Sequence, residues 1–424
     1  MNRELVGCPE SAPASAKGTP EVYDVEAITP MFGGSATPRE VDGKHPVRIS
    51  AIRGHLRFWW RATRGASCAT VGDLRDQEGR IWGNTKLASP VRIELSAVKE
   101  GTRCAIGGYP AYALFPFKED HRHRIEAADG RVGVSFRLRL ECPAELEKDV
   151  AAAMWAWVNF GGIGARTRRG AGALYCAKLA APDRVRMGEW LAGKIEEFGL
   201  VTKDEWRPWP FLSFAPGFRP RIVQDAQRDA TLAWAAAVKV MYDFRQGVPT
   251  GRKAGTGKKS GRSHWPEADS IRALTGESEG RHEEPVTLAN PGAHPGFPRA
   301  GLGLPIVLKF YHEDVVDARN DCEISPADAS RMASPIILRP IKTADGHFFA
   351  MAVCLKARQP DELKINFYDR ATSLPPGTVL DRTTMRRPDL ASYPASPMHG
   401  RTRHGVALEA FLTFAGEHGF REVK

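Results

Sequence analysis

Three segments in the first half of the chain carry the alternation of apolar and polar residues that half-buried strands require. The strictest is VGVSFRLRL at residues 132–140, and residues 22–29 and 90–98 follow the same pattern. Residues 172–179 are predicted to form a fourth strand that returns to the same sheet.

Two segments between these strands place apolar residues at helical spacing. In residues 49–65 one face carries Ile49, Ile52, Leu56, Trp59, Trp60 and Thr63. We assign this face, with both tryptophans, to the core and predict Ser50 as the helix N-cap. The second helix starts after Pro143 and ends at Gly161, since glycine commonly follows the last helical residue.

The resulting order is strand, helix, two strands, helix, strand, which is the β-α-β-β-α-β order of the ferredoxin-like unit. RNA-recognition modules share this order. The second half mixes both element types less legibly, with strands predicted at 304–310, 335–341 and 348–355 and helices at 226–244, 265–272 and 406–415. Turn-forming residues at 206–210 predict a boundary. We therefore expect an α+β protein with two domains, 1–205 and 206–424.

The stretch FGGIGARTRRGAGAL at residues 160–174 holds five glycines and three arginines. Glycine allows a backbone to approach a ligand closely, and adjacent backbone N–H groups in such a turn can form an anion-binding nest. Arg166, Arg168 and Arg169 add permanent charge that fits a phosphate or stacks on a base. The stretch therefore predicts a clamp on a polyanion, and a flexible basic hairpin turn is the alternative.

A stripe of arginines lies beside the apolar face of the predicted helix 49–65. Arg53, Arg57, Arg61 and Arg64 fall at helical spacing with no acidic residue between them. Such a stripe can simply face solvent. Because like charges four residues apart repel each other, an anion lying across the stripe is the second interpretation.

The most basic segment of the second half, residues 247–263, reads GVPTGRKAGTGKKSGRS. It departs from a phosphate-binding P-loop, because Gly257-Lys258 is followed by Lys259 instead of Ser or Thr and position 252 is Arg. We interpret it as a flexible basic loop.

Composition supports an anionic partner. The chain of 424 residues has 60 Lys plus Arg against 50 Asp plus Glu, a net charge of +10. This balance favours nucleic acid first and an anionic membrane surface second, while a merely basic enzyme stays possible. The seven cysteines form no C-x-x-C pair, which fits a reducing cytosol. We find neither a signal peptide nor an apolar run long enough to span a membrane.

Several of these stretches resemble one family, the RAMP proteins that form the first subunit of the Cmr effector complex in type III-B CRISPR systems. The resemblance is carried by TPMFGG at 29–34, IRGHLRFWWRA at 52–62, GGIGARTRRGAGAL at 161–174, SHWPEADSIR at 263–272 and RMASPIILRP at 331–340. The helix LRFWWRA together with WPEADSIR is the most specific part.

The resemblance implies two fused ferredoxin-like, RRM-like RAMP domains. It also implies a cytoplasmic antiviral-defence ribonucleoprotein in which the chain holds the 3′ part of the guide RNA (crRNA), supports target single-stranded RNA capture and contacts other Cmr-type RAMP subunits. The RNA-binding positions expected from the motifs are Arg48, Ser50, Arg53, Arg57, Arg61, Gly161, Gly162, Ile163, Gly164, Ala165, Arg166, Thr167, Arg168, Arg169 and Gly170.

Three function classes remain open from the sequence. The first is a non-catalytic RNA-binding subunit, in which sheet, basic helix and glycine-rich stretch form one groove and Trp59, Trp60 or Tyr109 are possible base-stacking residues. The second is a RAMP endoribonuclease that processes guide precursors by metal-independent acid–base chemistry, with His45 or His55 as candidates. By helical angle, His55 points away from the arginine stripe. The third is a general single-strand binder. We expect no metal or cofactor, since no ligand motif is found.

Overall fold

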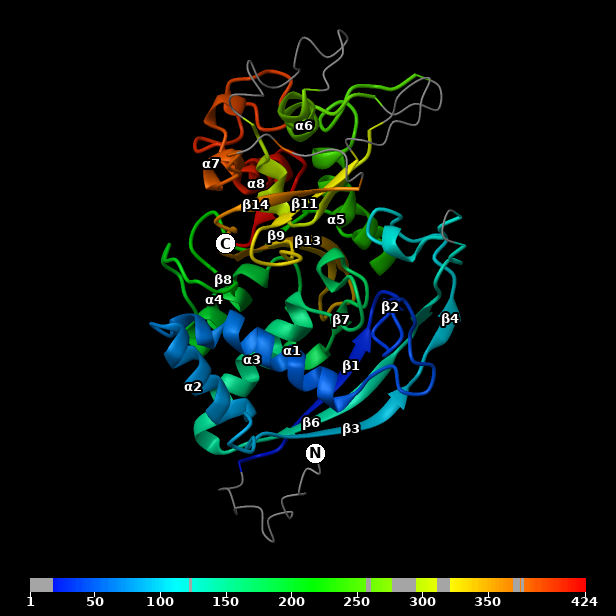
Figure 1. Ribbon diagram of the computed structural model, residues 1–424. Helices are drawn as coiled ribbons and strands as arrows, with labels where there is room; N and C mark the ends of the chain where they lie inside the picture. Colours follow the sequence, from blue (N-terminus) through cyan, green and yellow to red (C-terminus); the bar gives the residue numbers. More distant parts are fainter. Residues whose placement is uncertain are drawn as a thin grey trace, which may run out of the picture.

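The computed structural model describes residues 18–121, 124–256, 261–276, 295–310, 321–368, 374 and 377–424. Its first sheet has the strand order β3-β6-β1-β7 with antiparallel neighbours. These strands are β1 Glu21–Ala27, β3 Arg92–Lys99, β6 Ser135–Glu141 and β7 Leu174–Tyr175. Helix α1 (Ile49–Ala62) connects β1 to β3, and α3 (Glu147–Phe160) connects β6 to β7. Both helices cover the same face of the sheet (Figure 1), so the predicted ferredoxin-like unit is confirmed.

A second unit repeats this topology. Its sheet has the order β12-β13-β9-β15, and α5 and α8 connect the strands in the same way as α1 and α3 do in the first sheet. The bounds are β9 Arg221–Ile222, α5 Ala230–Arg245, β12 Ile336–Lys342, β13 Phe348–Lys356, α8 Ala407–Glu417 and β15 Arg421–Glu422. The predicted α+β fold with two ferredoxin-like units is therefore present.

Further elements extend the two units. Next to the first are α2 Val71–Trp82, α4 Met187–Phe198 and a small sheet of β2 Met31–Phe32, β5 Gly130–Val132 and β4 Thr102–Cys104. Next to the second are β8 Phe211–Leu212, α6 Glu267–Thr275, α7 Arg382–Met385 and a sheet of β10 Ile306–Leu308, β11 Cys322–Pro326 and β14 Leu363–Phe367. In Figure 1, β11 and β14 of this last sheet lie farther from the first sheet than β9 and β13 do, and α6 lies farther still.

Three local predictions are corrected. Helix α1 begins at Ile49 with Arg48 at the N-cap position, so Ser50 lies inside the first turn and is not the cap. The segment 132–140 is divided at Gly133, whose φ of +76° ends β5 before β6 begins. Of the strand predicted at 172–179, only Leu174–Tyr175 pairs with β1, because Ala177–Leu179 forms a 3₁₀ turn.

The face of the first sheet away from α1 and α3 carries paired charges. Asp24 on β1 lies opposite Arg137 on β6, and Arg137 Nε donates a 2.8 Å hydrogen bond to Asp24 Oδ1. Glu94 on β3 pairs with Arg139 on β6 at 2.8 Å. Cross-strand pairs of opposite charge stabilise a sheet. This face has matched charges and no row of stacking aromatic residues on β1 and β6, unlike the RNA-binding sheet of an RRM.

One hydrophobic cluster extends across both units, although the second unit also has a cluster of its own. Trp155 of α3 is fully buried and its ring lies 6.4 Å from that of Phe214, beyond the predicted boundary at residues 205 and 206. The same core continues to Ile337 on β12. The exact domain boundary stays a prediction.

A fully buried arginine joins the units at this core. Arg339 of β12 donates hydrogen bonds to three backbone oxygens of the first unit: Val158 O at 2.8 Å, Gly161 O at 2.7 Å and Leu174 O at 2.6 Å. Burial lowers the pKa of its guanidinium. The three acceptors lie at the end of α3, directly after it and in β7, so they hold both ends of the glycine-rich stretch.

Replacing Arg339 by Met should lower the free energy of unfolding by about 3 kcal/mol, because buried carbonyl oxygens are left without a donor. Urea unfolding followed by circular dichroism measures this change. Arg421→Met is the matched control, since Arg421 is exposed on β15 and its loss should cost less than about 0.5 kcal/mol. Equal stability of the two variants would contradict the role of Arg339.

Candidate nucleic-acid interface

The glycine loop, defined as residues 161–170, follows α3 directly and is pressed against β2. Ala165 N donates to Phe32 O at 2.7 Å, and Ile163 N donates to Gly172 O at 2.9 Å. Gly164 has a φ of +78°, and a Cβ atom there would lie 2.7 Å from Phe32 O. Glycine is therefore required at this position by both backbone conformation and space.

Part of the loop backbone is unused by the protein. Within the described part of the chain, no hydrogen bond is made by the N–H groups of Gly162, Gly164, Arg166, Thr167 or Arg168. Gly161 and Ile163, by contrast, already donate within the fold. Consecutive N–H groups without partners in a turn are the elements of an anion-binding nest. Some of the glycine N–H groups predicted to bind an anion, those of Gly162 and Gly164, are therefore available as donors.

The three arginines of the loop donate hydrogen bonds to backbone oxygens of the protein. Arg168 donates to Ser334 O, and Arg169 Nη1 donates to Ile336 O at 2.7 Å. Arg166 Nε donates to Ala113 O at 2.8 Å. Burial lowers the pKa of all three guanidinium groups. Arg168 and Arg169 therefore fasten the loop to the second unit, a function that the sequence did not indicate.

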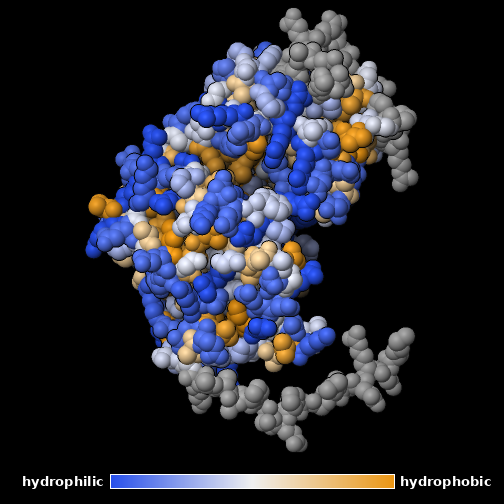
Figure 2. Space-filling view, turned by 90° about the vertical axis from the view of Figure 1, so that its left-hand side faces the viewer, coloured by the Kyte–Doolittle hydropathy of each residue, from blue (hydrophilic) through white to orange (hydrophobic). Residues whose placement is uncertain are grey.

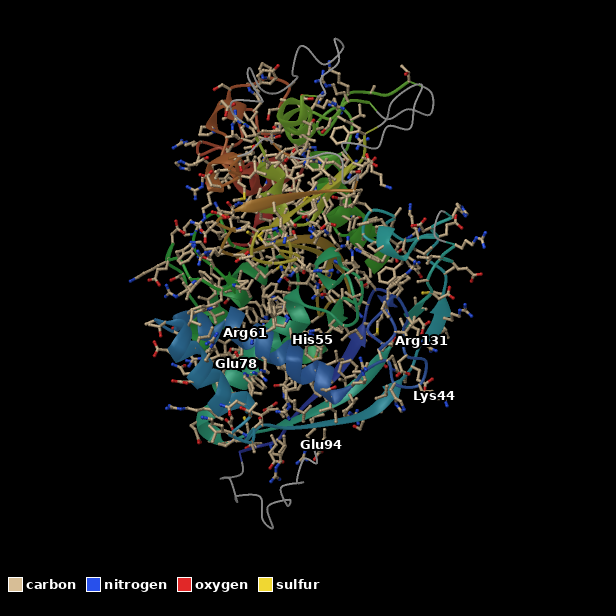
Figure 3. All side chains as sticks on the ribbon, in the orientation of Figure 1. Lys44, His55, Arg61, Glu78, Glu94 and Arg131 are labelled. Atoms are coloured by element: carbon tan, nitrogen blue, oxygen red, sulfur yellow. The ribbon has the colours of Figure 1, made fainter. Side chains whose placement is uncertain are left out.

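Three of the four arginines of the stripe are paired with carboxylates of the protein. Arg57 Nε donates to Glu78 Oε1 at 2.7 Å, and Arg61 Nη1 lies 2.8 Å from both oxygens of Glu78. Arg64 Nε pairs with Asp149 at 3.2 Å. Glu78 belongs to α2, and Figure 3 shows it beside Arg61. The anion that lies across the stripe is therefore, for these arginines, a protein side chain.

The stripe and the glycine loop lie on different sides of α1. The side that faces the loop carries Arg48, Ala51, His55 and Phe58, and two pockets lie between it and the loop. Arg53, which donates to Val91 O at 3.3 Å, belongs to the stripe and lines neither pocket. The groove predicted from stripe plus loop is thus not formed by these residues, although α1 does contribute to a groove through its other side.

The two pockets adjoin each other at His55. One of about 160 Å³ is lined by Arg48, Ala51, His55, Gly164 and residues of the β2 region. The other, about 180 Å³, is lined by His55, Phe58, Gly162, Thr167 and Arg168 among others. Neither of these two pockets has a carboxylate in its lining. A phosphate entering here would meet N–H groups and arginine and no negative charge.

His55 is held as a neutral stacking group. Its imidazole lies parallel to the Trp157 ring, at an interplanar angle of 13° and a centroid distance of 5.5 Å. Burial lowers the pKa of His55 to about 4. The imidazole is therefore uncharged at neutral pH. Helical angle placed it correctly away from the stripe, but that same angle directs it to the glycine loop.

The remaining residues singled out in the sequence lie partly in the core and partly on the surface. Trp59 and Trp60 are buried in the core as expected, and Trp60 Nε1 donates to Asp149 at 2.7 Å. Arg48 and Ser50 are exposed at the start of α1, and Arg48 donates to Gly34 O. The tip of the predicted basic loop 247–263 lies outside the described residues at 257–260, while its described flanks pair through Lys253 N and Arg262 O at 2.9 Å.

Another face of the molecule carries both hydrophilic and hydrophobic residues. The face that carries α2 and α4 is largely hydrophilic, with apolar residues in small separate patches (Figure 2). Among the described residues, no helix is long and apolar enough to cross a membrane. The same residues contain no cluster of three or more His, Cys, Asp or Glu side chains that could hold a metal ion.

The low pKa of His55 predicts a pH dependence of stability. The folded value of about 4 lies below the ordinary 6.5, so between these values the unfolded chain binds a proton that the folded protein does not. The free energy of unfolding should therefore fall as pH is lowered from about 6.5 to 4. Denaturant unfolding of His55→Gln should lack this component, and NMR titration of the imidazole gives the pKa directly.

His45→Gln is the control for this measurement, because His45 is exposed. Its unfolding free energy should follow that of the unchanged protein at every pH. An imidazole of His55 that titrates near 6.5 would contradict the buried, neutral state.

Comparison with known proteins identifies relatives. The RAMP superfamily matches residues 24–175, which contain part of β1 and all of α1, α3 and the glycine loop. The CRISPR system Cmr subunit Cmr1-2 of Pyrococcus furiosus is 32% identical over 180 residues, covering 36% of this chain and 92% of the relative. Cmr1-1 of the same organism is 28% identical over 189 residues, covering 43% of this chain and 52% of the relative.

Solved structures with a similar arrangement include Cmr1 from Pyrococcus furiosus in its apo form, with a TM-score of 0.49 and 14% identity over 84% of this chain and 94% of that one. A chain of the type III-B Cmr-beta complex bound to cognate target RNA has a TM-score of 0.44 and 13% identity over 80% of this chain and 96% of that one. On the sequence relationship to Cmr1-2, this chain belongs to the RAMP superfamily and, within it, to the Cmr1 family of CRISPR Cmr subunits.

Proposed function

We propose that the chain is a non-catalytic RNA-binding subunit of a type III-B CRISPR ribonucleoprotein in the cytosol. It holds the 3′ part of the guide RNA, supports capture of target RNA and contacts other Cmr-type subunits. The family relationship supports membership of the complex. The observation that carries RNA binding is the groove between α1 and the glycine loop, where unpartnered N–H groups, Arg48 and carboxylate-free pockets lie together.

The chemistry of this groove suits a nucleotide chain. N–H groups of Gly164, Thr167 and Arg168 are free to donate to a phosphate oxygen, and Arg48 adds charge at the rim. The neutral ring of His55 and the ring of Phe58 line the pocket and offer flat surfaces to a base. Protein groups of this kind bind backbone and base faces without reading a sequence. In a guide-dependent complex the sequence is read by base pairing.

The stripe of Arg53, Arg57 and Arg61 stays part of the proposed RNA-binding surface, in a secondary position. The side chains of Arg57 and Arg61 are 39% and 33% exposed, so they can still approach a phosphate. Glu78 already compensates part of their charge. We therefore place the stronger contact on the side of α1 that faces the glycine loop.

Arg48→Gln should weaken binding of single-stranded RNA about tenfold at low salt and reduce the salt slope by about one. Fluorescence anisotropy at several salt concentrations measures both quantities. Arg92→Gln is the matched control, because Arg92 is exposed on β3 at a distance from the groove and carries the same charge. Equal losses in both variants would mean that only net charge matters, and the groove would be rejected.

The alternative function, cleavage of guide precursors, is less supported by the geometry. His55 stacks on Trp157 in a neutral form, and neither adjoining pocket contains a carboxylate to act with it. His45 is exposed in the loop before α1. General acid–base cleavage needs two groups that exchange protons with the substrate.

The purified protein should therefore leave a guide precursor RNA intact, with and without divalent metal ions. Denaturing gel electrophoresis of end-labelled RNA is the measurement. Specific cleavage that is lost in His55→Ala or His45→Ala, while RNA affinity is retained, would establish the nuclease and contradict the proposal.

A further inference from the structure

A group of aromatic and arginine side chains lies beside the glycine loop, and none of its residues lines the two pockets described above. Phe115, in the 3₁₀ turn Phe115–Phe117, is 61% exposed, although its neighbour Phe117 is buried. The guanidinium of Arg166 lies 5.3 Å from the centre of the Phe115 ring. A phenylalanine this exposed contributes little to the core, so its position beside an arginine indicates a role in binding.

The group continues onto α5 of the second unit. Tyr112 accepts a 3.2 Å hydrogen bond from Arg245 Nη1, and its ring meets that of Tyr242 edge to face at 5.6 Å. Tyr242 is 42% exposed. The segment 109–117 thus packs on both the glycine loop and α5, and both Arg166 and Arg245 donate hydrogen bonds to it.

The charge of the two arginines is not compensated by the protein. Among the described residues, no carboxylate pairs with Arg166 or Arg245, and their hydrogen-bond acceptors are Ala113 O and the hydroxyl of Tyr112. Nε of Arg245 is buried without a partner. Burial and, to a smaller extent, the charge of Arg245 lower the pKa of Arg166. Two like charges held together with spare donors favour a bound anion.

We propose that Phe115, Tyr112, Tyr242, Arg166 and Arg245 form a second RNA-binding strip, which continues the groove across the glycine loop toward α5. A base of single-stranded RNA stacks on the open face of Phe115, and a neighbouring phosphate is bound by Arg166 and Arg245. Aromatic rings beside arginines bind single strands in this way. The inference rests on the proposed RNA-binding function and adds the direction in which the strand leaves the groove.

An acidic protein segment is a competing occupant of a cationic surface. The exposed rings favour RNA, because a base can stack on Phe115 whereas a carboxylate gains nothing from it. The connection with the groove also favours RNA, since Arg166 belongs to the glycine loop whose N–H groups lie on the path.

The test compares oligouridylates of about 6 and about 12 nucleotides by anisotropy with the full chain. Phe115→Ala should weaken binding of the longer RNA about fivefold to 100-fold and that of the shorter one much less. Phe115→Trp should restore it, and Arg245→Gln should lower the salt slope for the longer RNA by about one. Trp206→Ala is the matched control, an exposed aromatic residue outside the strip, and should bind like the unchanged protein.

The outcomes separate this inference from the proposed function. If Arg48→Gln weakens binding while Phe115→Ala and Arg245→Gln do not, the groove stands and the strip is overturned. If the unchanged protein binds neither RNA, the proposed function itself fails. If Phe115→Ala leaves RNA affinity unchanged but prevents co-purification of another Cmr subunit, the strip is a protein interface and the inference is wrong.

Discussion

One buried guanidinium, that of Arg339, connects the two ferredoxin-like units and sets the position of the glycine loop. Its donors reach Val158 O before the loop, Gly161 O at its first residue and Leu174 O after it. A charge removed from water is tolerated only where its donors are satisfied. Because these acceptors belong to the first unit and the arginine to the second, packing of the two units adds contacts that fix the ends of the loop.

Two arginines of the glycine loop also form hydrogen bonds to the second unit. Arg168 and Arg169 donate to backbone oxygens at Ser334 and Ile336, next to and within β12, so the loop and β12 are tied in both directions. Because the guanidinium groups of Arg168 and Arg169 are hydrogen-bonded to backbone oxygens, the donors of the loop that remain without a partner among the described residues are backbone N–H groups. A site made of fixed N–H groups is already ordered before a ligand arrives, which reduces the entropy lost on binding. In this protein, arginine provides much of the scaffold and the backbone provides much of the site.

Hydrophobic periodicity was sufficient to predict the order of helices and strands in the first unit. The alternation in β6 and the apolar face of α1 are long enough to identify each element, and the order of elements then specifies the topology. The second unit was harder because β9 and β15 have only two residues each, Arg221–Ile222 and Arg421–Glu422. No periodicity exists in two residues. The segment between α5 and β12 also adds α6, β10 and β11, so strands that pair in space are far apart in sequence.

The sequence pointed to α1 and to the glycine loop, but it did not show which side of α1 faces the loop. Helical angles describe how residues on α1 relate to one another, and they correctly separate His55 from Arg57 and Arg61. They cannot show that α2 turns back to place Glu78 across those arginines, because that contact depends on tertiary packing. A row of positive charge is evidence for an anion, and the protein itself can supply it. Donors without a protein partner, and not only charge, therefore suggest where to look for an external phosphate, and within the described part of the chain the N–H groups of Gly164, Thr167 and Arg168 in the glycine loop are such donors.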